Sequence, residues 1–147
     1  MSAPLIDVKD LSVAFVSEGR ETLAVDKISF HINPGETLAL VGESGSGKSV
    51  SALSILQLLP YPQASHPSGE VLIDEKNLGG ADEKTLRAIR GNRISMVFQE
   101  PMTSLNPLHT IERQVGEMLT LHKGLRGAAV KARVIELLIK VGIPDPA

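Results

Sequence analysis

The sequence predicts an α/β fold with an antiparallel sheet at the start of the chain and helices at its end. Two segments of the first third, residues 5–16 and 22–33, carry apolar residues at strand spacing and are separated by a turn. A glycine-rich segment at residues 42–49 stands between an apolar run and a segment of helical periodicity. From residue 110 onward, apolar residues recur at the spacing of amphipathic helices.

Composition limits what the chain can be. Its 147 residues suit one domain or most of one, and a hydrophobic content of 42% is enough for a core. A net charge of -2 gives no basic excess, which speaks against a nucleic-acid-binding surface. The absence of cysteine excludes disulfides and thiolate metal sites. The N-terminus lacks the pattern of a signal peptide, and no apolar run approaches the ~20 residues that cross a bilayer.

The glycine-rich segment is the strongest functional signal. Residues 42–49 read Gly-Glu-Ser-Gly-Ser-Gly-Lys-Ser and fit the pattern G-x-x-x-x-G-K-[ST] of a phosphate-binding loop. Gly45 and Gly47 permit backbone angles that a side chain would forbid, so that successive N–H groups can surround an anion. Lys48 adds a positive charge for the outer phosphates, and the Ser49 hydroxyl is a suitable hard oxygen ligand for magnesium.

The flanks of this segment also fit a phosphate-binding loop. Residues 36–41 form a short apolar run after Pro34 and Gly35, which predicts a buried strand. Residues 50–59 carry leucines at near-helical spacing, which predicts a helix with its positive N-terminal end toward the phosphates. A chance glycine-rich turn would require neither flank, so we expect nucleotide binding.

The rest of the chain predicts short strands, loops and helices. In order, we expect an extended loop at 60–68, a strand at 68–73, a turn-like stretch at 74–80, a helix at 82–90 capped by Asp82, a second buried strand at 94–98, a loop at 99–107, and two helices within 110–123 and 130–141 that form an αα-hairpin.

Two further residues are candidates for nucleotide contacts, and the residues alone leave both open. Phe15 either packs in the core, as strand aromatics usually do, or offers a flat ring on which adenine stacks. Gln99 follows the predicted strand at 94–98, where open α/β sheets place ligand contacts if that strand is parallel to the first. The alternative is a loop glutamine that faces water.

Together these residues resemble the N-terminal part of an ABC transporter ATP-binding subunit of the peptide and nickel importer branch, closest to importers of peptides and microcin C. The resemblance covers nearly the whole chain. It rests on residues 42–49, on Ser-Gly-Glu at 68–70, and on the run Arg-Gly-Asn-Arg-Ile-Ser-Met-Val-Phe-Gln-Glu-Pro-Met-Thr-Ser-Leu-Asn-Pro at 90–107, which is similar to the family's Q-loop segment.

This resemblance implies an incomplete P-loop NTPase core of the ABC ATPase type. We expect residues 1–107 to hold the N-terminal antiparallel β subdomain, the phosphate-binding strand and helix, and the Q-loop. Residues 108–147 would begin a helical subdomain that is truncated.

The resemblance also implies ATP as ligand, Mg²⁺ as its metal and a set of site residues. Phe15 matches the A-loop position that stacks on adenine, and Gln99 matches the Q-loop glutamine that reaches magnesium and the attacking water. Lys48 and Gln99 are the expected catalytic residues, and Ser49 and Gln99 the expected magnesium ligands. The expected nucleotide-binding residues are Phe15, Gly42, Glu43, Ser44, Gly45, Ser46, Gly47, Lys48, Ser49 and Val50.

Partners and location follow from the same resemblance. Membrane-spanning permease subunits would dock through the Q-loop and the helical subdomain, and a second ATPase domain would pair head to tail. The protein would then be cytoplasmic, held at the cytoplasmic face of the inner membrane by its partners, with no nucleic acid bound.

The chain departs from the family pattern in three elements. The 147 residues contain no signature Ser-Gly-Gly motif, no Walker B strand that ends in Asp and Glu at the required place, and no switch histidine. We therefore expect a truncated piece of a longer protein. It should bind nucleotide weakly and not hydrolyse it, whereas the full-length parent would be an ATPase that drives peptide uptake.

Two other functional classes stay open. One is a different P-loop enzyme, a GTPase or small-molecule kinase, although the chain has no Asn-Lys-x-Asp motif. The other is an ABC-type ATPase that acts on nucleic acid, against which the missing basic patch speaks.

Overall fold

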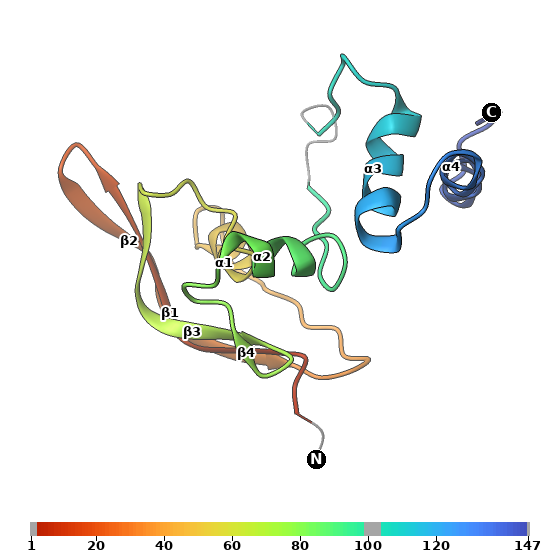
Figure 1. Ribbon diagram of the computed structural model, residues 1–147. Coiled ribbons are helices and arrows are strands. Elements are labelled where there is room, and N and C mark those ends of the chain that lie inside the picture. The colour runs from red at the N-terminus through yellow and green to blue at the C-terminus, as the bar shows by residue number, and fades with distance from the viewer. Residues whose placement is uncertain (1–2, 99–103, 147) are drawn as a thin grey trace. The chain divides into compact units, whose positions relative to one another are not determined.

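The computed structural model describes residues 3–98 and 104–146 of the chain (Figure 1). By its internal contacts the chain divides into two compact units, Met1–Leu86 and Arg87–Ala147. Each unit is described separately below.

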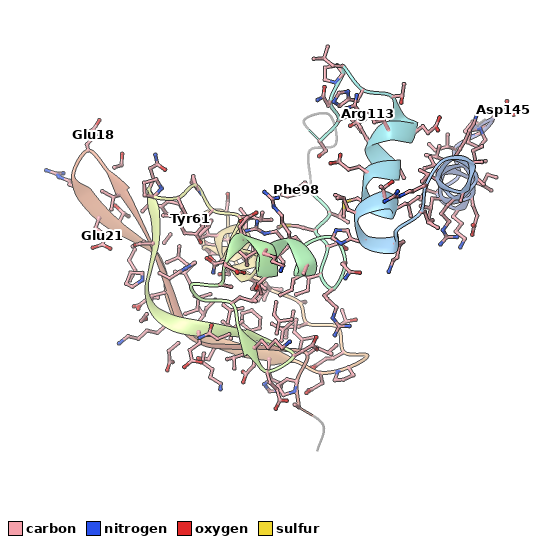
Figure 2. All side chains as sticks on the ribbon, viewed as in Figure 1. Glu18, Glu21, Tyr61, Phe98, Arg113 and Asp145 are labelled. Carbon is pink, nitrogen blue, oxygen red and sulfur yellow. The ribbon has the colours of Figure 1, made fainter. Side chains whose placement is uncertain are left out.

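The first unit is built on a four-stranded antiparallel sheet. Its strand order is β2-β1-β3-β4, so that β1 lies between β2 and β3 (Figure 1). The first two strands form a hairpin whose tip carries Glu18 and Glu21 (Figure 2), which confirms the predicted pair of strands. The strands are β1 (Ile6–Ser17), β2 (Arg20–Ile32), β3 (Ala64–Ile73) and β4 (Lys76–Asn77).

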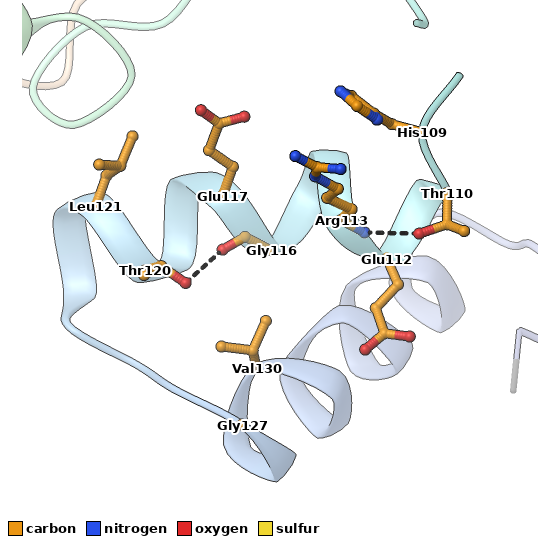
Figure 3. A pocket seen from close by; sticks show the side chains of 10 residues that line it. All are labelled: His109, Thr110, Glu112, Arg113, Gly116, Glu117, Thr120, Leu121, Gly127 and Val130. Carbon is orange, nitrogen blue, oxygen red and sulfur yellow. Dashed lines mark hydrogen bonds between the residues drawn. The ribbon is translucent and has the colours of Figure 1, made fainter. Parts of the chain in front are cut away.

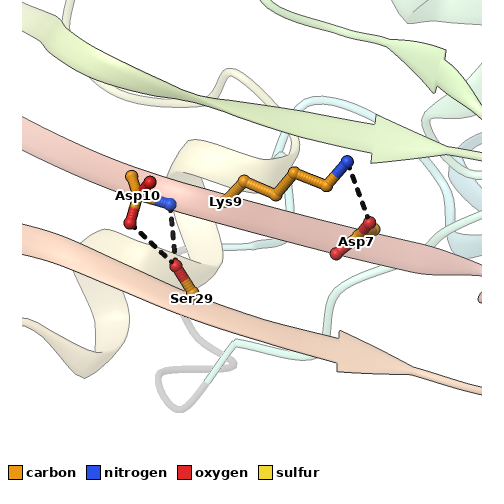
Figure 4. A network of polar contacts seen from close by, with 4 residues as sticks. All are labelled: Asp7, Lys9, Asp10 and Ser29. Atoms are coloured by element: carbon orange, nitrogen blue, oxygen red, sulfur yellow. Dashed lines mark hydrogen bonds and ion pairs between the residues drawn. The ribbon is translucent and has the colours of Figure 1, made fainter.

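The sheet is irregular, because extra residues interrupt its registers. On β1, Asp10 has a φ of 45°, and the register shifts between Val8 and Leu11. Side chains fasten this bulge: the Asp10 N–H donates to Ser29 Oγ at 2.8 Å, and Ser29 Oγ donates to Asp10 Oδ1 at 3.2 Å (Figure 4). From the other neighbour, Ser68 Oγ donates to the Asp10 carbonyl at 3.0 Å. These bonds fix where β1 bends.

Helix α1 (Lys48–Ile55) covers the sheet and completes the first core. Val50, Leu53 and Ile55 pack against a cluster of aliphatic side chains, as expected for a chain with so few aromatics. The buried members of this cluster are Val8, Leu11, Val13, Val25, Leu59, Ala64 and Val71.

Helix α2 (Glu83–Ile89) starts at the predicted cap. The Thr85 N–H donates to Asp82 Oδ1 at 2.8 Å, which confirms Asp82 as the residue that satisfies the first turn. Hydrogen bonding from the Thr85 side chain and then from the Thr85 N–H lowers the pKa of the Asp82 carboxyl, because both stabilise the charged form.

The second unit contains two helices in contact, α3 (Ile111–Lys123) and α4 (Ala128–Lys140), joined by a short turn, which confirms the two predicted helices. Thr110 caps α3 by accepting from the Arg113 N–H at 3.2 Å, and Gly124 ends the helix with a φ of 65°. The two helices meet where the buried Gly116 faces α4. On the outside of α4, Arg133 and Lys140 pair with Glu136 and lower the pKa of its carboxyl.

The structure contradicts both predicted buried strands. Residues 36–41 and 95–98 have no strand structure, and Val41 and Val97 are 88% and 95% exposed. A buried strand needs neighbours that complete its backbone hydrogen bonds. Among the described residues, Ile94 makes only an isolated parallel bridge with Arg90, and no named strand lies beside either segment.

Other boundaries also differ from the prediction. β3 begins at Ala64, inside the expected loop at 60–68, because Ala64 pairs with Phe15 on the long β1 strand. The short β4 forms within the stretch expected to be a turn, by pairing with the end of β3. None of the described helices is long and apolar enough to span a membrane.

Candidate nucleotide-binding site

The predicted phosphate-binding loop lies directly before α1. Its glycines adopt the left-handed backbone that the pattern requires, with a φ of 80° at Gly45 and 86° at Gly47. A turn closes within the loop, where the Ser46 N–H donates to the Glu43 carbonyl at 3.3 Å. The loop is therefore folded back on itself before the helix begins.

Gly47 is also held by a close approach to β2. A Cβ atom added there would lie 2.7 Å from the Ala24 carbonyl oxygen and 3.1 Å from Val25 Cγ2. The loop thus rests on the backbone of β2, and only a residue without a side chain fits at this contact.

Lys48 points its ammonium group back onto the loop. Its Nζ donates to the Glu43 carbonyl at 2.6 Å, to the Gly42 carbonyl at 2.8 Å and to Ser46 Oγ at 3.1 Å. A lysine ammonium has three protons, so the loop oxygens engage all of them. The charge is held at the loop rather than extended into solvent.

The first turn of α1 is suited to an anion. Ser51 is the first residue of the helix whose N–H reaches an intrahelical carbonyl, that of Gly47 at 2.8 Å. The amides before it have no intrahelical partner, and they form the positive end of the helix dipole. No acidic side chain stands in this first turn, all of which is described, so nothing there opposes a bound phosphate.

A cavity of about 310 Å³ opens at this loop. Seven of the nine predicted loop residues line it, and the other two, Gly42 and Glu43, supply the carbonyls that hold Lys48. The lining also includes Ala24 of β2, which no pattern in the sequence marks as a site residue. The lining residues are Ala24, Ser44, Gly45, Ser46, Gly47, Lys48, Ser49 and Val50.

The loop geometry agrees with a comparison against known families. A family model described as ABC transporter matches residues 25–147, which include the whole loop and everything after it. The chain belongs to the ABC transporter family. This confirms the family expected from the sequence.

Relatives of this ABC transporter chain carry names from peptide transport. It is 62% identical over 97% of its length to the peptidoglycan transport ATP-binding protein YejF of Agrobacterium fabrum, covering 26% of that protein. It is 46% identical over 97% of its length to the oligopeptide transport ATP-binding protein OppD of Bacillus subtilis, covering 40% of that protein. The chain therefore spans between about a quarter and two fifths of these relatives.

Solved structures confirm the α/β fold of an ABC ATPase. The ATP-binding cassette MJ0796, in a dimeric post-hydrolysis state bound to ADP and Pi, matches with a TM-score of 0.77 and 27% identity, over 91% of this chain and 56% of that one. The cbiO1 protein of Clostridium perfringens, described as part of the ABC transporter complex cbiONQ, matches with a TM-score of 0.68 and 25% identity, over 97% of this chain and 52% of that one.

Phe15, a further predicted site residue of this ABC transporter chain, is not among the residues that line the described loop cavity. Phe15 is on β1, half-buried, opposite Thr22 of β2, and it packs against the aliphatic core. Its role as an adenine platform stays a prediction. Gln99, with its proposed catalytic and magnesium-binding roles, lies outside the described residues.

Ser49 fits a magnesium ion that is held mainly by other groups. Its side chain is exposed and lines the cavity beside Lys48. Over the part of the chain that the structure describes, no group of three His, Cys, Asp or Glu side chains could hold a metal. A single hydroxyl suits Mg²⁺, which keeps several waters and takes phosphate oxygens as ligands.

A larger hollow, of about 790 Å³, lies along α3 in the second unit (Figure 3). Its lining mixes charges of both signs, from Glu112, Arg113 and Glu117, and Val130 of α4 closes one side. The described residues that line it include no lysine and no glycine-rich loop, so they do not form a phosphate-binding loop.

Proposed function

We propose that this chain is the nucleotide-binding part of an ABC importer subunit, and that the whole protein couples ATP binding and hydrolysis to uptake of peptides or peptide-like compounds. The observation that carries the proposal is the Lys48 ammonium, held by three loop oxygens at the positive start of α1. Relatives named for peptidoglycan and oligopeptide transport support the cargo class. They do not favour a GTPase, a kinase or a nucleic-acid ATPase.

Each residue of the loop has a defined part in holding the triphosphate. The amides of residues 45–49 would donate to phosphate oxygens, and Lys48 would bind the β- and γ-phosphates. Ser49 would hold Mg²⁺, which when bound neutralises charge on the outer phosphates. Gln99 would place the attacking water, and Phe15 would stack on adenine. Binding and positioning account for most of the catalysis expected of such a site.

Phosphate binding requires Lys48 to exchange a hydrogen bond. All three ammonium protons are engaged by the loop, so an entering oxygen must replace one acceptor. Ser46 Oγ is the most distant of the three, at 3.1 Å, and it belongs to a side chain that can rotate. We expect Ser46 to be released while both carbonyl contacts keep Lys48 in place.

The second unit would connect this site to the membrane. Permease subunits would contact the Q-loop and the helices α3 and α4, and a second ATPase domain would complete the site head to tail. The dimeric MJ0796 cassette and the cbiONQ complex are precedents for such assemblies in related proteins. The subunit would then act at the cytoplasmic face of the inner membrane, and the permease and its binding protein would choose the peptide.

Calorimetric titration with Mg·ATP tests nucleotide binding. Lys48→Ala removes a charge-assisted contact worth about 1.5–3 kcal/mol, so the affinity should fall roughly tenfold or more. Lys9→Ala is the control, because Lys9 is an exposed lysine of the sheet that pairs with Asp7 at 3.4 Å (Figure 4). Equal heats for wild type and Lys48→Ala would remove the proposal, and a strong preference for GTP would redirect it to a GTPase.

Phosphate release separates binding from turnover. We expect the 147-residue chain to release no more phosphate from ATP than its Lys48→Ala variant, because the sequence contains no signature motif, Walker B acid or switch histidine. Sustained release by the wild-type chain alone would contradict this expectation.

A further inference from the structure

The strand that supports the phosphate-binding loop contains a bulge at Ala24. Val13 of β1 pairs with Val25 of β2, but the next residue, Ala14, pairs with Leu23. Ala24 is therefore the extra residue of β2, with no partner of its own in this register. Bulges of this kind redirect a side chain, and they are common beside functional sites.

At the bulge, the two neighbouring residues Ala24 and Val25 both lie against the loop. In a regular strand, adjacent residues point to opposite faces. Here Val25 is buried in the core against which α1 packs, and Ala24 lines the cavity of the phosphate-binding loop. Leu23, the next residue, is 50% exposed. The extra residue of the register, Ala24, is thus the residue of β2 that stands at the cavity.

The wall formed by Ala24 cannot move away from the loop independently. The Ala24 carbonyl lies 2.7 Å from the point where a Gly47 Cβ would stand, so strand and loop are in direct contact. Two residues before Ala24, Thr22 pairs with Phe15, the predicted adenine platform. Along β2, Ala24 therefore stands between the partner of that platform and the loop that takes the phosphates.

We infer that Ala24 is a specificity-determining residue whose small side chain leaves room for the sugar of a nucleoside triphosphate beside the loop. The inference rests on the proposed nucleotide binding. A bare polyphosphate needs only the loop amides and Lys48, whereas the sugar of a nucleotide must also fit beside Ala24. A larger side chain at this position should therefore exclude nucleotides and still admit inorganic polyphosphate.

The test compares two ligands on one set of variants. ATP and inorganic tripolyphosphate, each with magnesium, are titrated calorimetrically into wild type, Ala24→Leu and His31→Leu. His31 is an exposed residue of the same strand that does not line the cavity, so it controls for an added leucine on β2. We expect Ala24→Leu to weaken ATP about tenfold or more and to leave tripolyphosphate within about twofold of wild type. His31→Leu should leave both within about twofold.

Each result decides the inference. Unchanged ATP affinity in Ala24→Leu would overturn it, as would parallel loss of both ligands in a variant whose circular dichroism is that of wild type. If the leucine variant folds poorly, Ala24→Val gives the decision, with a loss of several fold expected for ATP alone. A wild-type chain that bound tripolyphosphate but not ATP would overturn the inference and leave the anion-binding loop standing. Binding of neither ligand by wild type would overturn the proposed function as well.

Discussion

Gly47 meets two separate demands at the level of a single residue. Its φ of 86° is a left-handed conformation, which costs a residue with a Cβ about 1–2 kcal/mol. Its contact with the Ala24 carbonyl at a projected 2.7 Å also excludes a Cβ on steric grounds. Gly45 meets only the first demand, since its φ is 80° but nothing lies within 4 Å of a projected Cβ.

These two glycines form a matched pair for mutation. We expect Gly45→Ala to lower the unfolding free energy by about 1–2 kcal/mol and Gly47→Ala by about 1–3 kcal/mol more, because overpacking adds to the strain. Urea unfolding followed by fluorescence of Tyr61, the only tyrosine in a chain without tryptophan, measures both. Equal losses in the two variants would show that β2 does not constrain the loop.

The loop residues can be identified from the sequence alone, whereas their neighbours on other elements cannot. Gly45, Gly47 and Lys48 follow from one contiguous pattern whose chemistry is local. Ala24 enters the cavity only through a register shift between strands, and no spacing in the sequence reports such a shift. Phe15 packs against the core, and its contact with adenine stays a prediction.

The helical hairpin of the second unit depends on a close contact between α3 and α4. A Cβ added to the buried Gly116 would lie 2.7 Å from Val130 Cγ1. Valine is β-branched and stiff in a helix, so Val130 cannot turn away cheaply. The contact therefore requires a glycine on α3 in spite of the low helix propensity of that residue.

Gly116→Ala should reverse the usual effect of this substitution. In an unhindered helix, alanine would stabilise by up to about 1 kcal/mol, but here we expect a loss of about 1–3 kcal/mol from overpacking. In a Val130→Ala background the same change should be neutral or stabilising, because the obstructing methyl group is gone. Thermal unfolding followed by circular dichroism at the helical band closes this double-mutant cycle. Additive effects would argue against the contact.

Helices were easier to predict than strands because their hydrogen bonds are local. The sequence predicts Asp82 as a cap, and its side chain accepts the expected backbone N–H, as that of Thr110 does at the start of α3. Residues 36–41 and 94–98 have the composition of buried strands, yet a strand is completed by its neighbours. In the part of the chain that the structure describes, those neighbours are missing, so most apolar side chains of these segments remain exposed, Val41 and Val97 above all.

At the scale of the whole chain, His66 links pH to folding. Partial burial lowers its pKa from the ordinary value of 6.5. Its ring lies 5.9 Å from that of Tyr61, edge to face. The lowered pKa values of Asp82 and Glu136 belong to carboxyls, which titrate in a more acidic range.

The His66 shift fixes the direction of a pH effect on stability. The unfolded chain takes up a proton at this histidine more readily than the folded chain, so its stabilising contribution is present above about pH 6.5 and is lost as the pH falls below it. We expect a lower unfolding free energy at pH 5.5 than at pH 7.5, and His66→Gln should reduce that difference. Urea unfolding read by Tyr61 fluorescence measures it. An unchanged difference in the variant would assign the effect to other groups.

The hairpin between β1 and β2 differs sharply from the bulge at Asp10 in how it would tolerate changes of chain length. At the tip, Glu18 and Gly19 both have positive φ, at 53° and 75°, and both are exposed beyond the Ser17–Arg20 pair. A reporter peptide inserted there would leave every strand pairing intact. Removing one residue at Asp10 would instead abolish the bulge, because Lys9 and Asp10 together oppose Ser29, and the hydrogen bonds between Asp10 and Ser29 would be lost with it.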